Sequence, residues 1–473
     1  MTVRLTLAIL LAAASPALAQ PAKQTPPAKQ AAPAKAQPVD DMVAFEKDLD
    51  ALFVTGGLTA DQAASRAGAV SPSVSRKVAE VEAAISQAEI AELARVPQVG
   101  GKLSYTRNSF LPPISFGGGV SIPFLQNYYL AEATLNVPLS DYVLRFPKLV
   151  DAAKLALQVA KSTKQAAIVS AGQDARLAYY EWLRARLQVL IAQRQLAQVQ
   201  ATLGQVRALA EVQRLSKADL LRVESQEAQA EQTVDQLQNL AELREEQLRL
   251  LIGSSPGEKL VVGEDVRKDI APPSTGSLDD MMKHAIERRL DMRVLEQGIA
   301  AKGKQADAEV ATALPRLSAF AVADYANPNQ RVFPQSEKFT GTWSAGVQLT
   351  WTLNDTLVGR ANTNRLRAET DELRADRESL MRGARIEILS SLQAVAIAQH
   401  ALATSQKGLI AAEEGYRVRK ELLAADRATA VELVDSETDL TRARITALNA
   451  RVDLRVALTQ LNHAVGDDTA QPK

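Results

Sequence analysis

The sequence predicts a mainly α-helical fold with a membrane β part. Two copies of a long coiled-coil helical hairpin make up most of the chain, and four β-strands per chain contribute to a twelve-stranded barrel that three chains build together. Three observations predict this fold. A heptad pattern recurs further along the chain, short stretches in both copies alternate between apolar and polar residues, and the N-terminus carries a secretory signal.

The repeat is seen by adding 213 to the apolar positions of one helical segment. The first set is Leu220, Val223, Ala230, Val234, Leu237, Ala241, Leu248 and Leu251, and the second is Leu433, Ser436, Ala443, Ala447, Ala450, Leu454, Leu461 and Ala464. Only Ser436 breaks the apolar pattern, and each match ends on a glycine, Gly253 or Gly466. A unit of long helices and two strands cannot bury its own apolar surface, so the repeat points to an oligomer.

The composition excludes several kinds of site. Hydrophobic residues make up 46% of the chain but aromatic residues only 4%, which suits packing between Ala/Leu-rich helices. The formal net charge is zero, so no nucleic-acid partner is expected, and the absence of cysteine excludes thiol chemistry. His284, His400 and His463 lie in separate predicted helices without metal-ligand spacing, and we expect them to be incidental. No nucleophile–base pair or phosphate-binding loop is found, so neither an enzyme nor a cofactor is expected.

The N-terminus reads as a signal peptide over residues 1–19. Arg4 precedes an apolar run from Leu5 to Ala14, and Ala17-Leu18-Ala19 fits a cleavage site before Gln20. The run is too short to be a membrane anchor, and no later run of about 20 apolar residues predicts a transmembrane helix. Residues 20–41 repeat Pro-Ala-Lys every six residues, which predicts a disordered spacer.

The remaining chain divides into a first copy (42–253), a linker (254–277), a second copy (278–466) and a disordered tail (467–473). Helices are expected at 59–96, 142–214, 218–252, 278–314, 356–425 and 431–465, and strands at 98–108, 119–139, 316–325 and 341–353. By length, the helix at 142–214 could pair with those at 218–252 and 278–314 placed end to end. The helix at 356–425 could pair likewise with 431–465 and 59–96.

The clearest strand alternates without exception from Thr342 to Leu353, so one face must meet an apolar medium and the other water. The strand from Arg316 is weaker, because Phe320 and Val322 fall on its polar face. An ordinary half-buried sheet covered by helices is one interpretation. Aromatic residues near the strand ends favour a membrane barrel instead; they are Tyr105, Tyr128, Tyr129, Tyr325, Trp343 and Trp351. Four strands cannot close a barrel, whereas three chains would supply twelve.

Two pairs of segments match between the copies. Val347–Asp355 and Val137–Asp141 lie at the strand-to-helix junctions, where Asp141 and Asp355 suit helix N-caps, and Arg427–Asp435 and Ser216–Leu221 follow the helix turns. These segments resemble the strand-to-helix junctions, and the segments after the periplasmic turns, of the TolC family of outer-membrane efflux proteins. The resemblance covers about residues 42 to 466. One departure is that the turns lack the glycine that the family commonly has there.

The resemblance implies a homotrimer that forms the exit duct of a tripartite efflux or type I secretion system. Its barrel would contact outer-membrane lipid, and its helices would form a gated tunnel across the periplasm. The implied partners are a periplasmic adaptor (membrane fusion protein) and an inner-membrane pump. The alternative is a soluble periplasmic coiled-coil adaptor or scaffold, although an adaptor usually has one hairpin between β-domains and this chain has two hairpins.

The turns near 214–219 and 425–432 would be the periplasmic tips. Charged residues there could form a gate, since carboxylates repeated around one axis would narrow the pore and favour cations; they are Asp219, Asp426, Arg427, Glu432 and Asp435. The alternative is that they are solvated charges or helix caps. Small and apolar residues would either pack the turns or meet the adaptor, namely Leu215, Ser216, Ala218, Ala428, Thr429 and Val431.

Overall fold

The computed structural model describes residues 41–116, 120–122, 124–213, 215–255, 257–268, 270, 276–425 and 427–469. The expected signal peptide, the linker up to residue 40 and residues 470–473 lie outside the described residues. The chain divides into two units, Met1–Lys47 and Asp48–Lys473. The boundary falls within helix α1 (Asp41–Leu52), and everything described below belongs to the second unit.

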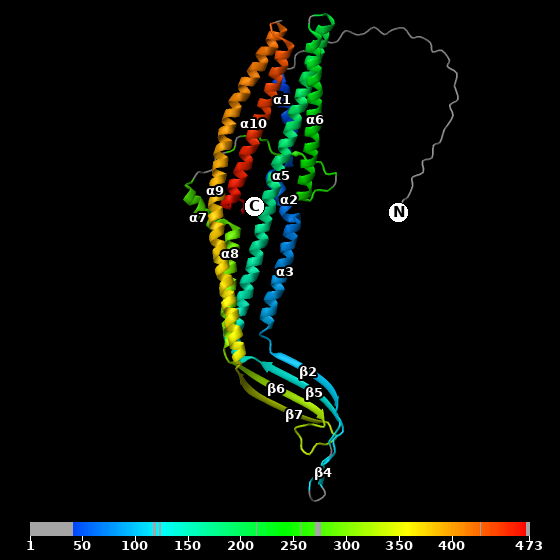
Figure 1. Cartoon of the computed structure of the whole chain (residues 1–473), viewed down its shortest axis with the longest axis vertical. Coiled ribbons are helices and arrows are strands. Elements are labelled where there is room, and N and C mark those ends of the chain that lie inside the picture. The colour runs from blue at the N-terminus through cyan, green and yellow to red at the C-terminus, as the bar shows by residue number, and fades with distance from the viewer. Residues whose placement is uncertain are drawn as a thin grey trace, which may run out of the picture. The chain divides into compact units, whose positions relative to one another are not determined.

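Two long helices form the framework of this unit (Figure 1). They are α5 (Phe146–Glu211), with 66 residues, and α9 (Leu353–Ala424), with 72 residues. At about 1.5 Å per residue, each is roughly 100 Å long. The shorter helices are α2 (Ala60–Val70), α3 (Pro72–Leu93), α4 (Leu139–Leu144), α6 (Lys217–Ile252), α7 (Leu278–Arg288), α8 (Leu290–Val310) and α10 (Ala430–Val465).

The predicted helix pairing is right for α5 and half right for α9. Helix α5 packs along α6 and α8, as expected, and α9 packs along α10. However, α2 and α3 lie against α5, whereas α8 takes the remaining place on α9. Small residues explain the contact between α2 and α5, because a Cβ on Gly172 would come within 3.3 Å of the Ala64 Cβ. The two backbones can therefore approach closely at this point.

Three helices that the sequence predicts as continuous are interrupted. The helix at 59–96 breaks at Ser71, which is extended because it precedes Pro72. The helix at 142–214 begins earlier, as α4, and restarts after Arg145 with Pro147 in its first turn. The helix at 278–314 breaks at Arg289, which is extended, and continues as α8 and the 3₁₀ turn Ala311–Ala313.

The two copies end their last helices in the same way. Helices α6 and α10 have 36 residues each, and both end at a glycine in the left-handed conformation. Gly253 has a φ of 62° and Gly466 has a φ of 79°. A residue with a side chain adopts this conformation only at an energetic cost, so the glycines at the end of the repeat are helix terminators.

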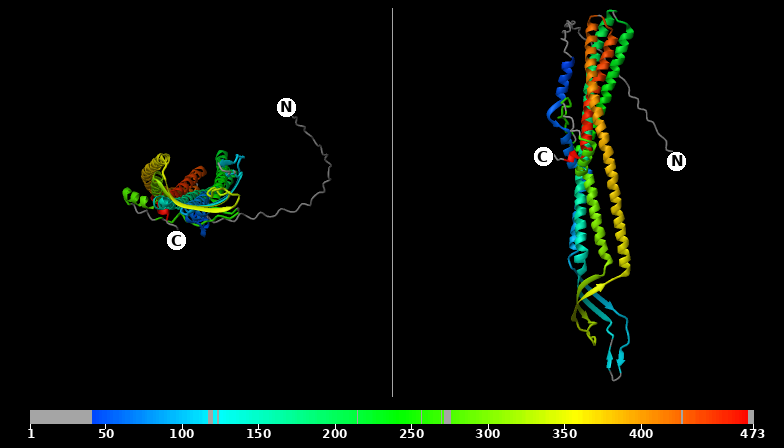
Figure 2. Two further views of the ribbon diagram at one scale, coloured as in Figure 1. Left: turned by 90° about the horizontal axis from the view of Figure 1, so that it is seen from below. Right: turned by 90° about the vertical axis from the view of Figure 1, so that its left-hand side faces the viewer.

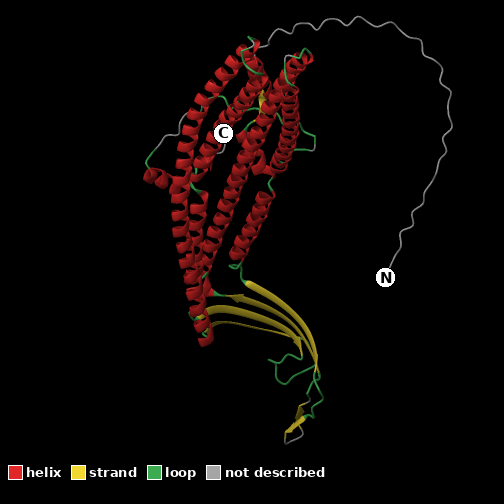
Figure 3. Ribbon diagram, turned by 45° about the horizontal axis from the view of Figure 1, so that its top comes forward, coloured by secondary structure: helices red, strands yellow, loops and turns green. Residues whose placement is uncertain are grey.

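The sheet is antiparallel, with the strand order β2-β5-β6-β7. These strands span Gln98–Arg107, Asn127–Val137, Arg316–Asn327 and Thr340–Thr350. The strand expected at 119–139 is divided, because β3 (Ile114–Phe116) and β4 (Val120–Ile122) form a separate hairpin before β5. A short strand, β1 (Phe53–Leu58), bridges to Val262 outside this sheet. The four-stranded sheet curves away from the ends of the helices (Figure 2, Figure 3).

The junctions between strands and helices place two aspartates differently from the prediction. Asp141 and Asp355 were expected to be N-caps, but the caps are Pro138 and Thr352. Each aspartate lies in the first turn of its helix, where a negative charge still favours the helix dipole. The last expected strand ends at Thr350 rather than 353, because α9 already begins at Leu353.

The strand register gives the sheet two chemically different faces. Residues paired directly across antiparallel strands lie on the same face. One face, here called the apolar face, carries Val99, Leu103, Tyr105, Tyr129, Ala131, Ala133, Leu135, Ala319, Ala321, Ala323, Tyr325, Trp343, Ala345, Val347 and Leu349. The other, the polar face, carries Lys102, Ser104, Glu132, Thr134, Asn136, Ser318, Asp324, Thr342, Ser344 and Gln348.

Phe320 is a large apolar side chain on the polar face. It lies opposite Gly346, and a Cβ on that glycine would come within 3.0 Å of the Phe320 ring. The ring therefore fills the space above a residue without a side chain. This contact explains why the strand from Arg316 alternates less clearly in the sequence.

One helix, α9, is long and apolar enough to span a membrane by length and composition, although the sequence predicts no such segment. Among the described residues, α9 alone contains a window that is long and apolar enough by composition, and 22% of that window is buried. Helix α9 exposes Ile386 and Ile397, at 70% and 69% of their surface. An exposed apolar stripe on a long helix is also typical of a coiled-coil surface that packs against another helix.

The tail was expected to be disordered from residue 467, but its first residues are ordered. Asp467–Thr469 form a 3₁₀ turn. Two of the three histidines hold this turn: His284 Nε2 lies 2.8 Å from Asp467, and His463 Nδ1 lies 2.6 Å from Asp468. These histidines are therefore contacts of the tail rather than incidental residues.

Candidate gate, membrane face and polar face

The first helical tip begins with a side-chain cap. The Ser216 hydroxyl accepts a hydrogen bond from the Asp219 backbone N–H at 3.1 Å and donates one to the Asp219 carboxylate at 2.6 Å. Both contacts fix the first turn of α6, where a carboxylate also interacts favourably with the helix dipole. Asp219 is thus held in a helix cap, and its role in gating stays a prediction.

The second tip has the same motif at the equivalent positions. Thr429 and Glu432 form a reciprocal capping box at the start of α10: the Thr429 N–H donates to the Glu432 carboxylate at 2.9 Å, and the Glu432 N–H donates to the Thr429 hydroxyl at 3.2 Å. The Arg419 guanidinium lies 3.2 Å from the same carboxylate. The backbone donor of Thr429, followed by Arg419, lowers the pKa of Glu432.

One ion pair joins the two tips. Arg222 on α6 lies 3.7 Å from Asp435 on α10. The two positions are equivalent in the repeat, because 222 plus 213 is 435. The copies therefore carry opposite charges at the same place, and the pair links two helices that the chain does not connect directly. Both side chains are more than half exposed, so water weakens their attraction.

An apolar cluster lies under the two tips. It combines Leu203 and Val206 of α5, Val223 of α6, and Ala430 and Val434 of α10. Leu215 and Leu220 pack against it, so Leu215 serves to pack the turn. A second cluster joins α9 and α10 through Tyr416, Leu433 and Leu440.

The first turn forms without the glycine that the family commonly has. Gln213 adopts the left-handed conformation there, with a φ of 59°. This costs a non-glycine residue some energy. The equivalent position in the second copy is Asp426, which lies outside the described residues.

The other predicted tip residues fall into two groups. Ser216, Ala218, Arg427 and Thr429 are exposed, whereas Ala428 and Val431 are half-buried. The Arg427 backbone N–H donates to the Leu422 carbonyl at 2.8 Å and closes the end of α9. Their roles in gating and docking stay predictions. The sequence missed Arg222 and Arg419, although the 213-residue offset would have matched Arg222 with Asp435.

The predicted aromatic residues lie toward both ends of the strands. Tyr105 and Tyr129 are paired across strands with ring centroids 5.0 Å apart, and Tyr325 stacks on Phe339 at 5.3 Å. Phe339, which the sequence did not single out, also contacts Tyr129 and completes this cluster. Tyr128 is paired with Thr106, on the opposite face from Tyr129. Trp343 is 78% exposed, and Trp351 near the helices is 60% exposed.

A row of charged residues crosses the polar face in register. Lys102 is paired with Glu132, Glu132 with Asp324, and Asp324 with Thr342. Side chains in register on one face are close enough to interact across the strands. The polar face therefore carries a cluster of charges at this level.

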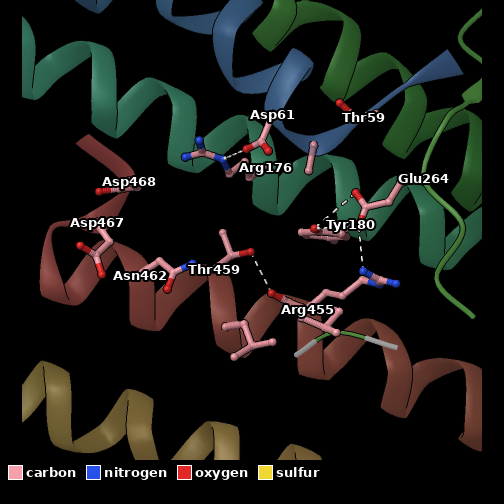
Figure 4. A pocket seen from close by; sticks show the side chains of 13 residues that line it. Thr59, Asp61, Arg176, Tyr180, Glu264, Arg455, Thr459, Asn462, Asp467 and Asp468 are labelled. Atoms are coloured by element: carbon pink, nitrogen blue, oxygen red, sulfur yellow. Dashed lines mark hydrogen bonds and ion pairs between the residues drawn. The ribbon is translucent and has the colours of Figure 1, made fainter. Parts of the chain in front are cut away.

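The structure also contains a polar cavity between α2, α5 and α10 (Figure 4). It measures about 600 Å³. On its wall, Arg455 lies 2.9 Å from Glu264 and donates to the carbonyls of Asp265 and Lys268. Tyr180 donates to Glu264 at 3.3 Å, and burial followed by the Glu264 charge raises the pKa of Tyr180, so its hydroxyl stays protonated. These contacts tie the linker between the copies to α10.

No group of His, Cys, Asp and Glu side chains suited to hold a metal ion occurs in the part of the chain that the structure describes. The arrangement is instead two capped helical hairpins joined to a sheet with one apolar and one polar face. This combination is typical of a class of membrane proteins in which one sheet surface meets lipid and the other meets water.

Comparison with known proteins agrees with this class. The family model described as "Outer membrane efflux protein" matches residues 63–254 and 281–467, which together exceed half of the chain. The chain therefore belongs to the outer membrane efflux protein family. As a member of this family, the chain is an outer-membrane protein that takes part in efflux, and its helices form a large periplasmic part. The family is one of efflux proteins rather than enzymes.

Solved structures of outer-membrane channels share the fold. The structure is similar to that of CusC, with a TM-score of 0.73 and 17% identity, over 88% of this chain and 93% of that one. It is similar to the Campylobacter jejuni CmeC outer membrane channel, with a TM-score of 0.72 and 13% identity, over 97% of this chain and 96% of that one. It is also similar to the Neisseria gonorrhoeae MtrE outer membrane channel in its open state, with a TM-score of 0.71 and 19% identity, over 86% of this chain and 88% of that one. No curated protein matches the chain.

Proposed function

We propose that three copies of this chain form the exit duct of a tripartite efflux or type I secretion system. The observation that carries the proposal is the apolar face of the sheet. Leu103, Trp343 and Leu349 are 85%, 78% and 68% exposed, yet they form one continuous surface with their neighbours in register. A surface of this kind needs an apolar medium, and lipid is the medium outside a membrane barrel.

Closure of the barrel requires more than one chain. In the described sheet, β2 and β7 are edge strands, each with a partner on one side only. Unpaired strand edges are not stable in a bilayer. Pairing β2 of one chain with β7 of the next would satisfy both edges, and three chains would give twelve strands with the polar face inward.

The helical part offers a matching surface. The apolar residues that α9 exposes, including Ile386 and Ile397, would pack against a neighbouring chain. The predicted partner of α9 was the helix at 59–96, which packs on α5 within its own chain. We propose that α3 of a second chain takes this place, since α3 exposes Ile90 and Leu93 at 58% and 64%.

Adjacent residues on opposite faces provide the test of the membrane face. Leu103 and Ser104 are neighbours on β2, but Leu103 lies on the apolar face and Ser104 on the polar face. A lysine facing lipid costs about 2–4 kcal/mol near the bilayer centre, whereas a lysine facing a water-filled lumen costs little. Leu103→Lys should therefore reduce the amount of heat-stable trimer in outer-membrane fractions, and Ser104→Lys should not. Equal effects of the two variants would contradict the orientation.

The mechanism would be gating rather than catalysis. We propose that the helical tips part when the adaptor and the pump engage, and that solute then diffuses through the lumen. Weak contacts suit this role, since Arg222 and Asp435 are held 3.7 Å apart at an exposed site. The Asp219→Ala, Asp435→Ala double variant should raise single-channel conductance in planar bilayers or weaken block by cations.

A matched control lies one turn further along α10. Asp439 is exposed and pairs with Arg442 of the same helix at 3.0 Å, so Asp439→Ala removes one carboxylate, as Asp435→Ala does, without freeing a tip. It should leave the conductance unchanged. If the double variant and Asp439→Ala carry equal currents, the tip carboxylates are not part of the gate.

The alternative function is a soluble periplasmic adaptor or scaffold. Fractionation separates the two functions, because a barrel protein needs detergent to leave the membrane. Recovery of the full chain in the soluble periplasmic fraction, without detergent, would contradict the proposed duct function.

A further inference from the structure

The segment between β6 and β7 does not extend freely from the sheet. It folds back over the polar face through Asn329, which is only 4% exposed. The Asn329 amide donates to the Thr340 carbonyl at 2.8 Å and to the Thr342 hydroxyl at 3.1 Å, and its oxygen accepts from the Arg331 N–H at 2.9 Å. A buried amide with three hydrogen bonds fixes the position of the segment that carries it.

Arg331 extends this attachment to the charged row. One of its guanidinium nitrogens lies 3.2 Å from the Asp324 carboxylate and donates to the Ser344 hydroxyl, also at 3.2 Å. The Asp324 side chain is 15% exposed, and that of Arg331 is 44% exposed. The pair is therefore less open to water than the ion pair at the helical tips.

The charges of this row balance only when Arg331 is included. Lys102 contributes one positive charge to the row, and Glu132 and Asp324 contribute two negative charges. Arg331 is the second positive charge, so the row with Arg331 is neutral. Without it, the row has a net charge of −1 in each chain.

We propose that the start of this segment, residues 329–331, forms a constriction at the outer mouth of the duct, and that Arg331 determines its width and its charge selectivity. This proposal rests on the proposed trimeric duct, in which the polar face lines the lumen. Three copies of Arg331 narrow the opening and cancel three of its carboxylates. A pore ringed by uncompensated carboxylates favours cations, so Arg331 lets anionic and cationic solutes leave equally well.

The test is the current through purified full-length trimer in planar bilayers under a KCl gradient. Arg331→Gln should raise the conductance and shift the reversal potential toward that of K⁺. Lys338→Gln is the matched control, since Lys338 is exposed in the same segment and the substitution removes the same charge. It should change the conductance and the reversal potential less than Arg331→Gln does.

Two more variants separate charge from width. Arg331→Lys keeps the charge and should leave the reversal potential close to that of the unmodified protein. The Asp324→Asn, Arg331→Gln double variant makes the charged row neutral again but lacks the ion pair. Its reversal potential should therefore return to that of the unmodified protein, while its conductance stays as high as that of Arg331→Gln. Identical currents for Arg331→Gln and Lys338→Gln, with normal currents in the unmodified protein, would overturn the role of Arg331 alone. A full-length chain that is not recovered as a trimer from the outer membrane would overturn the duct itself.

Discussion

The helical tips and the far end of the sheet are each fastened by an arginine–aspartate pair, but the pairs differ in their surroundings. Arg222 and Asp435 lie 3.7 Å apart with 59% and 57% of their side chains exposed. Arg331 and Asp324 lie 3.2 Å apart, and the carboxylate is 15% exposed. An exposed pair contributes about 0–1 kcal/mol, so this pair adds little to the cost of separating the tips. The shielded pair suits a fixed constriction.

The same two regions differ in where they place apolar side chains. Under the tips, Leu203 and Val223 are 1% and 0% exposed. On the sheet, Leu103 and Trp343 are 85% and 78% exposed. The helical tips thus follow the rule for proteins in water, and the sheet reverses it. This difference indicates that the two regions of one chain are built for two different media.

The largest expected effect tests this reversal directly. Leu203→Ala leaves a cavity where three helices meet, and such a change costs about 2–5 kcal/mol. Leu103→Ala removes the same atoms from the apolar face and should cost much less, because no protein cavity forms. The measurement is the free energy of unfolding in detergent, with hydrogen exchange at the tips as a local readout. A similar loss in both variants would contradict the comparison.

The caps at the two tips should give the next largest effect. Ser216→Ala and Thr429→Ala each remove a side-chain acceptor from the first turn of a helix, at a cost of about 0.5–2 kcal/mol. Thr429→Ala should cost more, because it also breaks the reciprocal contact with Glu432. Hydrogen exchange should accelerate at the start of α6 in the first variant and at the start of α10 in the second. Changes spread evenly over both helices would argue against local capping.

Much of the fold could be predicted because it depends on local periodicity. Heptad spacing located both long helices, and the offset of 213 residues placed Ser216 and Thr429, Asp219 and Glu432, and the two terminal glycines at equivalent sites. Breaks such as the one at Arg289 were missed, because that residue is held by Asp291 and by the more distant Glu387. Contacts between distant segments leave no periodic signal.

The candidate sites divide in the same way. The apolar face follows from strict alternation along each strand, so it could be predicted from residues such as Trp343 and Val347. The attachment of residues 328–339 could not, because Asn329 and Arg331 stand in an irregular segment and find Thr342 and Asp324 only after the strands pair. The stacking of Phe339 on Tyr325 could not be predicted either, because it depends on the path of the same segment.

The exposed ion pair at the tips should have a smaller effect on stability than the caps. A double-mutant cycle with Arg222→Ala and Asp435→Ala should give an interaction energy of about 1 kcal/mol or less. The value should fall further in high salt, since ions screen exposed charges. The free energy of unfolding, measured in low and high salt, checks this. A large coupling that persists in high salt would mean that the pair is shielded from water, which would remove the contrast with Arg331 and Asp324.

The smallest expected effect lies away from both ends, where the tail turn is held by histidines. The hydrogen bond that the His463 ring donates to the Asp468 carboxylate raises the pKa of His463 above its usual 6.5, against an opposing effect of burial. Glu387 also raises this pKa, and Arg289 lowers it. A pKa that is raised by folding stabilises the folded chain below the unfolded pKa, and this stabilisation is lost as the pH rises through the folded value. The thermal midpoint should therefore fall slightly as the pH rises above about 6.5, and hydrogen exchange near residues 463–468 should accelerate. His463→Gln should flatten this dependence, whereas His400→Gln, at an exposed site on α9, should preserve it. If His463→Gln leaves the slope intact, the pH dependence arises elsewhere and the tail turn is held by Asp467, His284 and Arg288.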